Sequence, residues 1–451
     1  MLLFSKLNLK SKKQTKMIKN SLMILISLSM MMFAKGSLAA VNIQQWQTQS
    51  GAKVMYVYAP ELPMLDIRIS FDAGSARDGD KWGLASLTTS LQGLKTQKHD
   101  EETLTKMAND LGANIGGGVD RDMAYFSLRT LTRDSILEPA LDLFSETMSQ
   151  TIFDAAIFDR EVKRLLVGLK QQELNPSSII RKAFWKSLYG THPYANPTHG
   201  TVESVKKIQL EDLKAFYQQY MVTRNASISI VGNIDRAQAE AISKQLLQGL
   251  PEGVKPAAIA KPIAITTTEH ILIDFDSSQT YFRQGQIGVE RGHPDYYALF
   301  LGNHLLGGSG FGSLLMEEVR EKRGLVYSVG SGFSPMKQAG PWLVALSTKN
   351  KSAKEAKKIV NETIRAFMKD FDDKHFQAIK DNLIGGFPLR IDSNGKIISY
   401  IAMIGFYDLP LDYLEAFPKA IERLTKQQVL DAWQRNMDLS KMSSVMVGKP
   451  E

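Results

Sequence analysis

The sequence predicts an α+β fold made of two similar, duplicated α/β-sandwich halves joined by a linker. Strand-like alternation and helix-like periodicity follow one another in the same order in both halves of the chain. A strand and a helix predicted at residues 123–130 and 135–153 have counterparts at 342–348 and 353–371, about 220 residues later. Between the halves, residues 251–268 contain three prolines and little amphipathic pattern, which is typical of a linker. The repeated order indicates an internal duplication.

The first half begins with strands and continues mainly with helices. Residues 65–73, LDIRISFDA, alternate apolar and polar side chains and give the clearest strand prediction. Gly112 suits a helix C-cap, and Pro176 disfavours helix at the residue before it. The predicted strands are 42–49, 53–58, 65–73, 113–118, 123–130 and 226–231, and the predicted helices are 84–94, 101–111, 135–153, 159–174, 178–189, 210–220 and 236–247.

The second half repeats that order. A charged turn follows its first predicted strand, as one follows strand 65–73 in the first half. The predicted strands are 281–289, 325–333, 342–348 and 443–447, and the predicted helices are 296–306, 314–323, 353–371, 375–387, 393–407 and 425–437. We therefore expect one domain at 41–250 and another at 269–451.

Most of the positive charge lies at the N-terminus. The 451-residue chain carries a formal net charge of +8, but residues 1–40 contain seven lysines and no acidic residue. The remainder is close to neutral, so we expect no nucleic-acid partner. A hydrophobic content of 43% with 23% charged residues is typical of a soluble globular protein.

An apolar run at residues 21–34 follows the basic stretch and leads to small residues ending in Ala39 and Ala40. This order is typical of a secretory signal peptide. The run is shorter than the ~20 residues that a transmembrane helix needs. We therefore predict a signal peptide at 1–40, cleavage after Ala39 or Ala40, a periplasmic protein, and no membrane span after cleavage. An uncleaved membrane anchor is the alternative.

The chain contains no cysteine. Disulfides, thiolate metal ligands, a cysteine nucleophile and a lipoprotein anchor are therefore excluded. An exported chain without cysteine depends on its own hydrophobic core, which a body of this size can provide.

The densest local pattern is residues 307–333, GGSGFGSLLMEEVREKRGLVYSVGSGF. A glycine-rich loop enters the helix predicted at 314–323, Gly324 ends that helix, and an alternating strand follows. Arg320 lies in the last helical turn and Tyr327 lies seven residues later. On residue chemistry alone, Arg320 is a cation that favours the helix C-terminus and Tyr327 is a packing residue.

These pieces together resemble the insulinase/pitrilysin-type zinc peptidases, in the branch that includes mitochondrial processing peptidase. Residues 306–329 are similar to the signature of that family's second half. Shorter matches follow in family order: Phe71-Asp72-Ala73-Gly74-Ser75 with Arg77, Leu128-Arg129-Thr130-Leu131, His192-Pro193-Tyr194 and Ile230-Val231-Gly232-Asn233. The resemblance implies a processing-peptidase-like fold in which the two halves form half of a clamshell.

This chain departs from the family's pattern at the zinc site. The resemblance places a His-x-x-Glu-His motif on the helix after Gly83-Leu84-Ala85 and a further ligand on a downstream helix. The two histidine positions fall on Ser86 and Ser90, the general base on Thr89, and the downstream ligand near Gly168. Hydroxyl groups bind Zn²⁺ poorly and cannot act as a base near neutral pH. We therefore expect no metal and no cofactor in this chain.

The second-half site keeps the family's pattern. The resemblance implies that Arg320 and Tyr327 bind the scissile carbonyl and the substrate backbone. It also implies that the loop with Gly308 and Gly310 is a flap at the chamber entrance. Gly116, Gly117 and Gly118 resemble the edge strand that pairs with extended substrate, although a bulge or flexible turn would suit these glycines equally well.

The sequence gives weaker support to three other kinds of site. The glycine-rich loop lacks the spacing of a phosphate-binding loop, and no Gly-x-Ser-x-Gly elbow frames Ser86 or Ser90. His192 and His199 flank a proline-rich loop and could be metal ligands, but no two histidines are three or four residues apart. Surface or turn roles are therefore favoured for the histidines.

The favoured hypothesis is a non-catalytic subunit of a periplasmic heterodimeric zinc metallopeptidase. It predicts a homologous partner that carries His-x-x-Glu-His and the zinc, and a peptide or unfolded polypeptide substrate. Arg320 and Tyr327 would complete the active site. The alternatives are a peptide-binding or scaffold protein with no proteolytic role, and a peptidase with a relocated metal.

Overall fold

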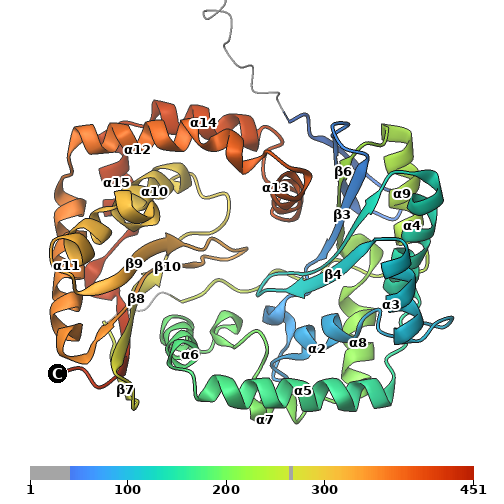
Figure 1. Cartoon of the computed structure of the whole chain (residues 1–451), viewed down its shortest axis with the longest axis horizontal. Coiled ribbons are helices and arrows are strands. Elements are labelled where there is room, and N and C mark those ends of the chain that lie inside the picture. The colour runs from blue at the N-terminus through green and yellow to red at the C-terminus, as the bar shows by residue number, and fades with distance from the viewer. Residues whose placement is uncertain (1–40, 264–267) are drawn as a thin grey trace, which may run out of the picture. The chain divides into compact units, whose positions relative to one another are not determined.

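The computed structural model describes residues 41–263 and 268–451, and residues 42–451 form one compact unit. The predicted signal peptide lies outside the described residues. None of the described helices combines the length and apolar character needed to cross a bilayer. The described part contains two β-sheets with helices packed on them (Figure 1).

The first sheet has six strands in the order β1-β2-β6-β3-β5-β4, in which only β2 and β6 are parallel neighbours. β3 and β6 lie inside it and supply buried Ile67, Ile69, Ile228 and Ile230 to the core. The strands are β1 Gln44–Gln47, β2 Lys53–Tyr58, β3 Met64–Phe71, β4 Asn114–Val119, β5 Ala124–Leu131 and β6 Ala226–Gly232. The helices of this half are α2 Leu84–Leu91, α3 Glu101–Asp110, α4 Asp134–Ser149, α5 Ala155–Glu173, α6 Pro176–Tyr189, α7 Val202–Val205, α8 Leu210–Tyr220 and α9 Arg236–Leu247.

The second sheet has five strands in the order β7-β11-β8-β10-β9, in which only β7 and β11 are parallel neighbours. Its core includes Trp342 on β10 and Trp433 on α15, whose rings meet edge to face at 5.7 Å. The strands are β7 His270–Asp274, β8 Gln279–Ile287, β9 Val326–Phe333, β10 Pro341–Lys349 and β11 Ser443–Gly448. The helices are α10 Tyr296–Asn303, α11 Ala353–Lys369, α12 Asp373–Gly385, α13 Asn394–Phe406, α14 Tyr413–Arg423 and α15 Lys426–Asn436.

The two sheets share one topology. The order β2-β6-β3-β5-β4 corresponds strand for strand to β7-β11-β8-β10-β9, with the same parallel pair in the same place. The predicted duplication is therefore a duplication of architecture, and β9 is the counterpart of the glycine-containing edge strand β4.

Each half also supplies a helix to the other half's sheet. α13, from the second half, packs on β2, β3 and β6, and α6, from the first half, packs on β8 and β11. Gly405 of α13 allows this approach, because a Cβ there would lie 2.7 Å from Met55. The two halves consequently share hydrophobic clusters, which include Phe184 of α6 with Val445 of β11.

A buried carboxylate joins the halves. Asp122, in the β4–β5 turn, accepts hydrogen bonds from the Tyr194 hydroxyl, from Lys337 N–H at 2.7 Å and from the Tyr407 hydroxyl at 2.9 Å. Nearby, Lys337 Nζ lies 2.5 Å from the buried Asp72 carboxylate. The same carboxylate forms a bidentate ion pair with Arg77. Lys337 and Tyr407 belong to the second half, so these contacts fasten it to the first.

The predicted linker is held in place along part of its length. Residues 251–263 form no helix or strand, yet the carbonyls of Ala257, Ile259 and Ala260 accept hydrogen bonds from Arg77, Gln338 and His192. The domain boundaries themselves remain a prediction.

The structure corrects several predicted elements. The helix predicted at 296–306 ends at Asn303 and continues as a π-helical turn, η4 His304–Gly308. The helix predicted at 314–323 is mostly a second π-helical segment, η6 Met316–Glu321. α5 starts four residues before its predicted start, because the Asp154 carboxylate caps Ala156 and Ile157 N–H. α7, α14 and β7 were not predicted.

Candidate functional site

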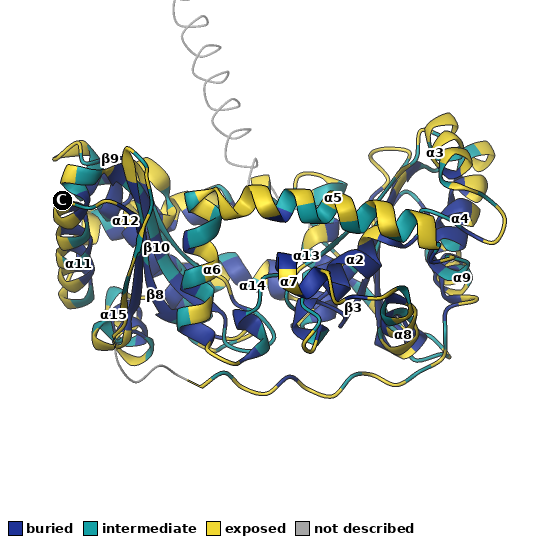
Figure 2. Cartoon of the chain, turned by 90° about the horizontal axis from the view of Figure 1, so that it is seen from below, coloured by how far each residue is buried: buried dark blue, intermediate teal, exposed yellow. Residues whose placement is uncertain are grey.

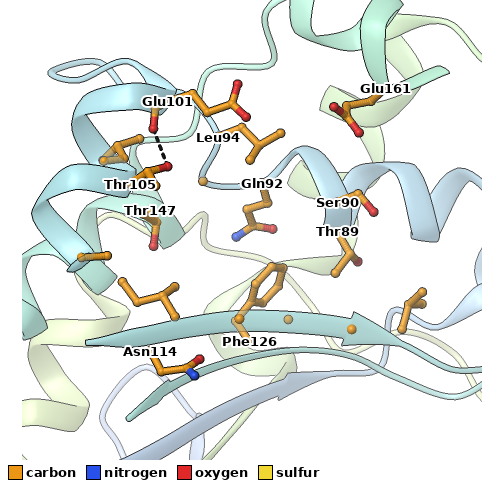
Figure 3. A pocket seen from close by; sticks show the side chains of 18 of the residues that line it. Thr89, Ser90, Gln92, Leu94, Glu101, Thr105, Asn114, Phe126, Thr147 and Glu161 are labelled. Carbon is orange, nitrogen blue, oxygen red and sulfur yellow. Dashed lines mark hydrogen bonds between the residues drawn. The ribbon is translucent and has the colours of Figure 1, made fainter. Parts of the chain in front are cut away.

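The residues at the expected zinc positions share one pocket in the first half. A pocket of about 1170 Å³ is lined by Ser86, Thr89 and Ser90 of α2 and by Gly168 of α5. Its wall also contains Gly116, Gly117 and Gly118 of β4. Figure 3 shows Thr89 and Ser90 on their helix above the strands, with Glu161 of α5 nearby. The structure thus brings together residues that lie about eighty positions apart in the sequence.

Helix α2 is fixed at its start by a buried carboxylate. Asp78 accepts hydrogen bonds from Gly83 N–H at 2.7 Å and Ala85 N–H at 2.8 Å. Gly83 adopts φ +99°, a conformation that side-chain-bearing residues avoid, so the turn into α2 requires glycine. Burial raises the pKa of Asp78 to about 7, against the opposing effect of these N–H donors.

Ser86 is already engaged by a histidine. Its Oγ lies 2.7 Å from His199 Nδ1, which reaches the pocket from the loop before α7. His199 is exposed overall, but desolvation of its ring, together with nearby Arg181, lowers its pKa and favours the neutral imidazole. Nothing in the local sequence around Ser86 indicates this partner, because the two residues are 113 positions apart.

The donors in the pocket do not fit a zinc ion. Ser86 is hydrogen-bonded, Thr89 Oγ1 is a buried hydroxyl without a hydrogen-bond partner among the described residues, and Gly168 has no side chain. Glu161 carries the acidic group on this part of α5, and it pairs with Arg160 at 2.9 Å and Arg164 at 3.6 Å. Imidazole and carboxylate are the ligands that zinc prefers, and the pocket offers one exposed imidazole and two carboxylates, Glu101 and Glu161, both paired with Arg160.

The second histidine of the proline-rich loop, His192, is engaged away from the pocket. His192, considered with His199 as a possible ligand, donates from Nε2 to Ala260 O at 2.8 Å and accepts Tyr194 N–H at Nδ1. Across residues 41–263 and 268–451, no group of three or more His, Cys, Asp or Glu side chains is arranged to hold a metal ion.

Strand β4 forms one edge of the first sheet and pairs only with β5. Its other edge therefore carries backbone groups that can pair with an extended chain. Gly117 and Gly118 lie close to the neighbouring strand: a Cβ would lie 2.9 Å from Tyr125 O at Gly117 and 2.7 Å from the Tyr125 hydroxyl at Gly118. Glycine is thus required at Gly117 by the backbone of β5, whereas the contact at Gly118 is to a tyrosine side chain that can shift.

Arg320 and Tyr327 lie on the second half and do not line the α2 pocket. Arg320 is on η6 and Tyr327 is on the edge strand β9, where its side chain is 85% exposed. The guanidinium carbon lies 5.3 Å from the Tyr327 ring centre. Gly324 has φ +62° and ends η6 as predicted, which sets the spacing between the two residues.

The glycine-rich loop lies beside this pair. Gly308 closes η4 tightly, because a Cβ there would lie 2.8 Å from Asn303 Nδ2. Gly310 has φ +66° and opens the short turn η5 Gly310–Gly312. The loop with both glycines directly precedes the helical segment that carries Arg320, and its Phe311 contacts Arg320. The role of this loop as a flap remains a prediction.

Two sequence profiles match the chain. Residues 53–202 match the profile described as Insulinase (Peptidase family M16), and residues 207–383 match the one described as Peptidase M16 inactive domain. A crystal structure described as a peptidase M16 inactive domain from Pseudomonas fluorescens is similar, with 39% identity and a TM-score of 0.88. The alignment covers 91% of this chain and 98% of that one.

Curated relatives are more distant. A Helicobacter pylori protein named "Non-peptidase homolog YmxG" is 24% identical over 421 residues, which cover 91% of this chain and 95% of that protein. A Bacillus subtilis protein named "Uncharacterized zinc protease YmxG" is 22% identical over 359 residues, or 79% of this chain and 86% of its own length.

Proposed function

Because the chain belongs to the insulinase (M16) family of peptidases, we propose that it is the non-catalytic subunit of a periplasmic, heterodimeric zinc metallopeptidase. It is a member of the family without the His-x-x-Glu-His motif, since Ser86, Thr89 and Ser90 occupy the corresponding positions. The zinc and the general base would belong to a homologous partner subunit that carries this motif.

The observation that carries the proposal is the contrast between two sites. At the zinc position the Ser86 hydroxyl is held by His199, the Thr89 hydroxyl is buried, and the Ser90 hydroxyl is exposed, so none of the three positions supplies an imidazole or a carboxylate. At the second site Tyr327 is exposed, and the Arg320 guanidinium lies beside its ring without an ion-pair partner in the described residues. Loss of one site with retention of the other suits a subunit that contributes only half of an active site.

The contribution of Arg320 and Tyr327 is electrostatic. N–H and O–H donors aimed at a carbonyl oxygen stabilise the negative charge that develops there when the carbonyl is attacked. An arginine remains charged at any physiological pH and offers several donors in one plane. The substrate would be a peptide or unfolded polypeptide, since the free edge of β4 suits pairing with an extended chain.

The test is reconstitution with a homologous chain that carries His-x-x-Glu-His from the same genome. We expect the purified chain alone to cleave no peptide, and the mixture to form a one-to-one complex that cleaves faster than the partner alone. Peptide cleavage by the isolated chain would contradict the proposal. Failure to associate with any such partner, together with peptide binding without cleavage, would favour the peptide-binding or scaffold alternative.

A further inference from the structure

Phe311 is an exposed aromatic residue that contacts Arg320. It lies on η5, within the glycine-rich loop, and 68% of its surface is exposed. The Arg320 guanidinium carbon lies 4.5 Å from the Phe311 ring centre and 5.3 Å from the Tyr327 ring centre. A cation within about 6 Å of a ring centre is attracted to the ring's face. Arg320 therefore contacts two rings from two separate segments.

The other cations of η6 and its end are paired with carboxylates. Lys322 lies 2.8 Å from Glu317 and 2.7 Å from Glu318, and Arg323 lies 2.7 Å from Glu318. Within the residues that the structure describes, Arg320 has neither an ion pair nor a side-chain hydrogen bond. Its contacts are to rings, which hold the plane of the guanidinium and leave its N–H groups free to donate.

The loop that carries Phe311 is built between two π-helical turns. Ser309 N–H donates to His304 O at 3.1 Å, and Lys322 N–H donates to Glu317 O at 2.9 Å, each across five residues. Such wide turns are rare and are frequent at functional sites. They rotate the following residues relative to a regular α-helix.

The C-terminal end of the loop is anchored, although Phe311 itself is exposed. His375 Nε2 donates to Gly312 O at 2.7 Å, and the Ser313 hydroxyl donates to Gly310 O at 2.7 Å. These bonds fix the backbone on both sides of Phe311. The position of its ring is thus determined by the loop and not by a hydrophobic core.

We propose that Phe311 is a positioning residue that holds the Arg320 guanidinium in the orientation needed to bind the substrate carbonyl. This inference rests on the proposed function of Arg320. Phe311 acts through Arg320: its ring restricts the rotation of a long, otherwise free side chain and so reduces the entropy that carbonyl binding would remove.

The test uses the complex with its His-x-x-Glu-His partner. We expect Phe311→Ala to lower kcat roughly two- to fivefold, the effect of one exposed cation–π contact, with a smaller change in KM. Phe311→Tyr should retain activity, because it keeps a ring, whereas Phe311→Leu should behave like alanine. Leu389→Ala is the matched control, since Leu389 is 67% exposed and lies in the same half.

A double-mutant cycle separates this inference from the proposed function. In the Arg320→Ala background, Phe311→Ala should have no further effect on kcat. If Arg320→Ala itself leaves kcat unchanged, the proposed function of Arg320 fails. If Arg320→Ala lowers kcat but Phe311→Ala does not, or if the two effects are additive, only the inference about Phe311 is overturned.

A measurement on the chain alone gives a second readout. The Arg320 guanidinium carbon lies 4.5 Å and 5.3 Å from two ring centres, so we expect the NMR chemical shift of the Arg320 Nε–H proton to change when Phe311 is replaced by alanine, while the melting temperature stays the same. An unchanged resonance would overturn the inference without touching the proposed function.

Discussion

Replacing Asp122 is expected to loosen the junction between the two halves. The carboxylate is 1% exposed and accepts hydrogen bonds from the hydroxyls of Tyr194 and Tyr407 and from Lys337 N–H. In Asp122→Asn, an NH2 group in place of Oδ2 would face the Lys337 N–H, with which it cannot pair, and one in place of Oδ1 would force the Tyr194 hydroxyl, which already accepts Gln338 N–H, to accept instead of donate. Leaving a buried donor without its acceptor destabilises a protein by roughly 1–3 kcal/mol.

The assay is chemical unfolding followed by tryptophan fluorescence, because Trp185, Trp342 and Trp433 lie on both sides of the junction. Tyr407→Phe removes one donor and leaves the carboxylate two others, so its effect should be about 1 kcal/mol. Lys106→Met is the control, since the Lys106–Asp110 pair is largely exposed and should contribute little. If Asp122→Asn unfolds at the same denaturant concentration as the unaltered chain, the junction does not depend on this carboxylate.

Two further predictions concern the first-half pocket. The pKa of Asp78 is raised from its ordinary value to about 7, so the folded protein binds this proton more tightly than the unfolded chain. Its contribution to the free energy of unfolding is thus complete below pH ~4 and is lost as the pH rises towards 7. Between pH 4 and 8, the free energy of unfolding should fall less in Asp78→Asn than in the unaltered chain. An identical dependence of this free energy on pH in the two proteins would contradict the prediction. Second, Ser86→His, Thr89→Glu, Ser90→His and Gly168→Glu together should create a chain that retains about one zinc ion after dialysis. The unaltered chain should retain none, and stoichiometric zinc in it would disprove the account of this pocket.

Local sequence patterns predicted most elements well. Leu210–Tyr220 and Arg236–Leu247 have the predicted bounds, because each combines an amphipathic pattern with clear limits. α14 was missed because Pro418 lies inside it, and proline normally ends a helix. In the structure Leu414, Phe417 and Ile421 are buried on one face, so tertiary packing outweighs the proline.

The π-helical turns could not be predicted from helical periodicity. Residues 314–323 have the composition of an ordinary charged helix, and nothing in that composition distinguishes the wider turn of η6 from a regular α-helical turn. Short elements such as β7 depend on pairing with a distant strand, here β11, and carry little signal of their own.

The sequence predicted which residues gather at the candidate site, but it did not predict the contacts that those residues make. Family resemblance gave Ser86, Thr89, Ser90 and Gly168, and the structure places all four in one pocket. The contact of Ser86 with His199 and that of Arg320 with Phe311 both depend on loops whose paths no local pattern determines. The junction at Asp122 joins the β4–β5 turn to the segments that carry Tyr194, Lys337 and Tyr407, and it was likewise not predicted.

The role of Arg320 tests the central claim most directly. The measurement is the rate of peptide cleavage by the complex of this chain with its His-x-x-Glu-His partner, for the unaltered chain and for Arg320→Ala. If this chain completes the active site, kcat should fall roughly 10²–10³-fold, the usual effect of removing one donor to a developing oxyanion. Because Arg320 has no ion pair in the described residues, the variant should fold and associate normally. An unchanged kcat in an intact complex would contradict the account.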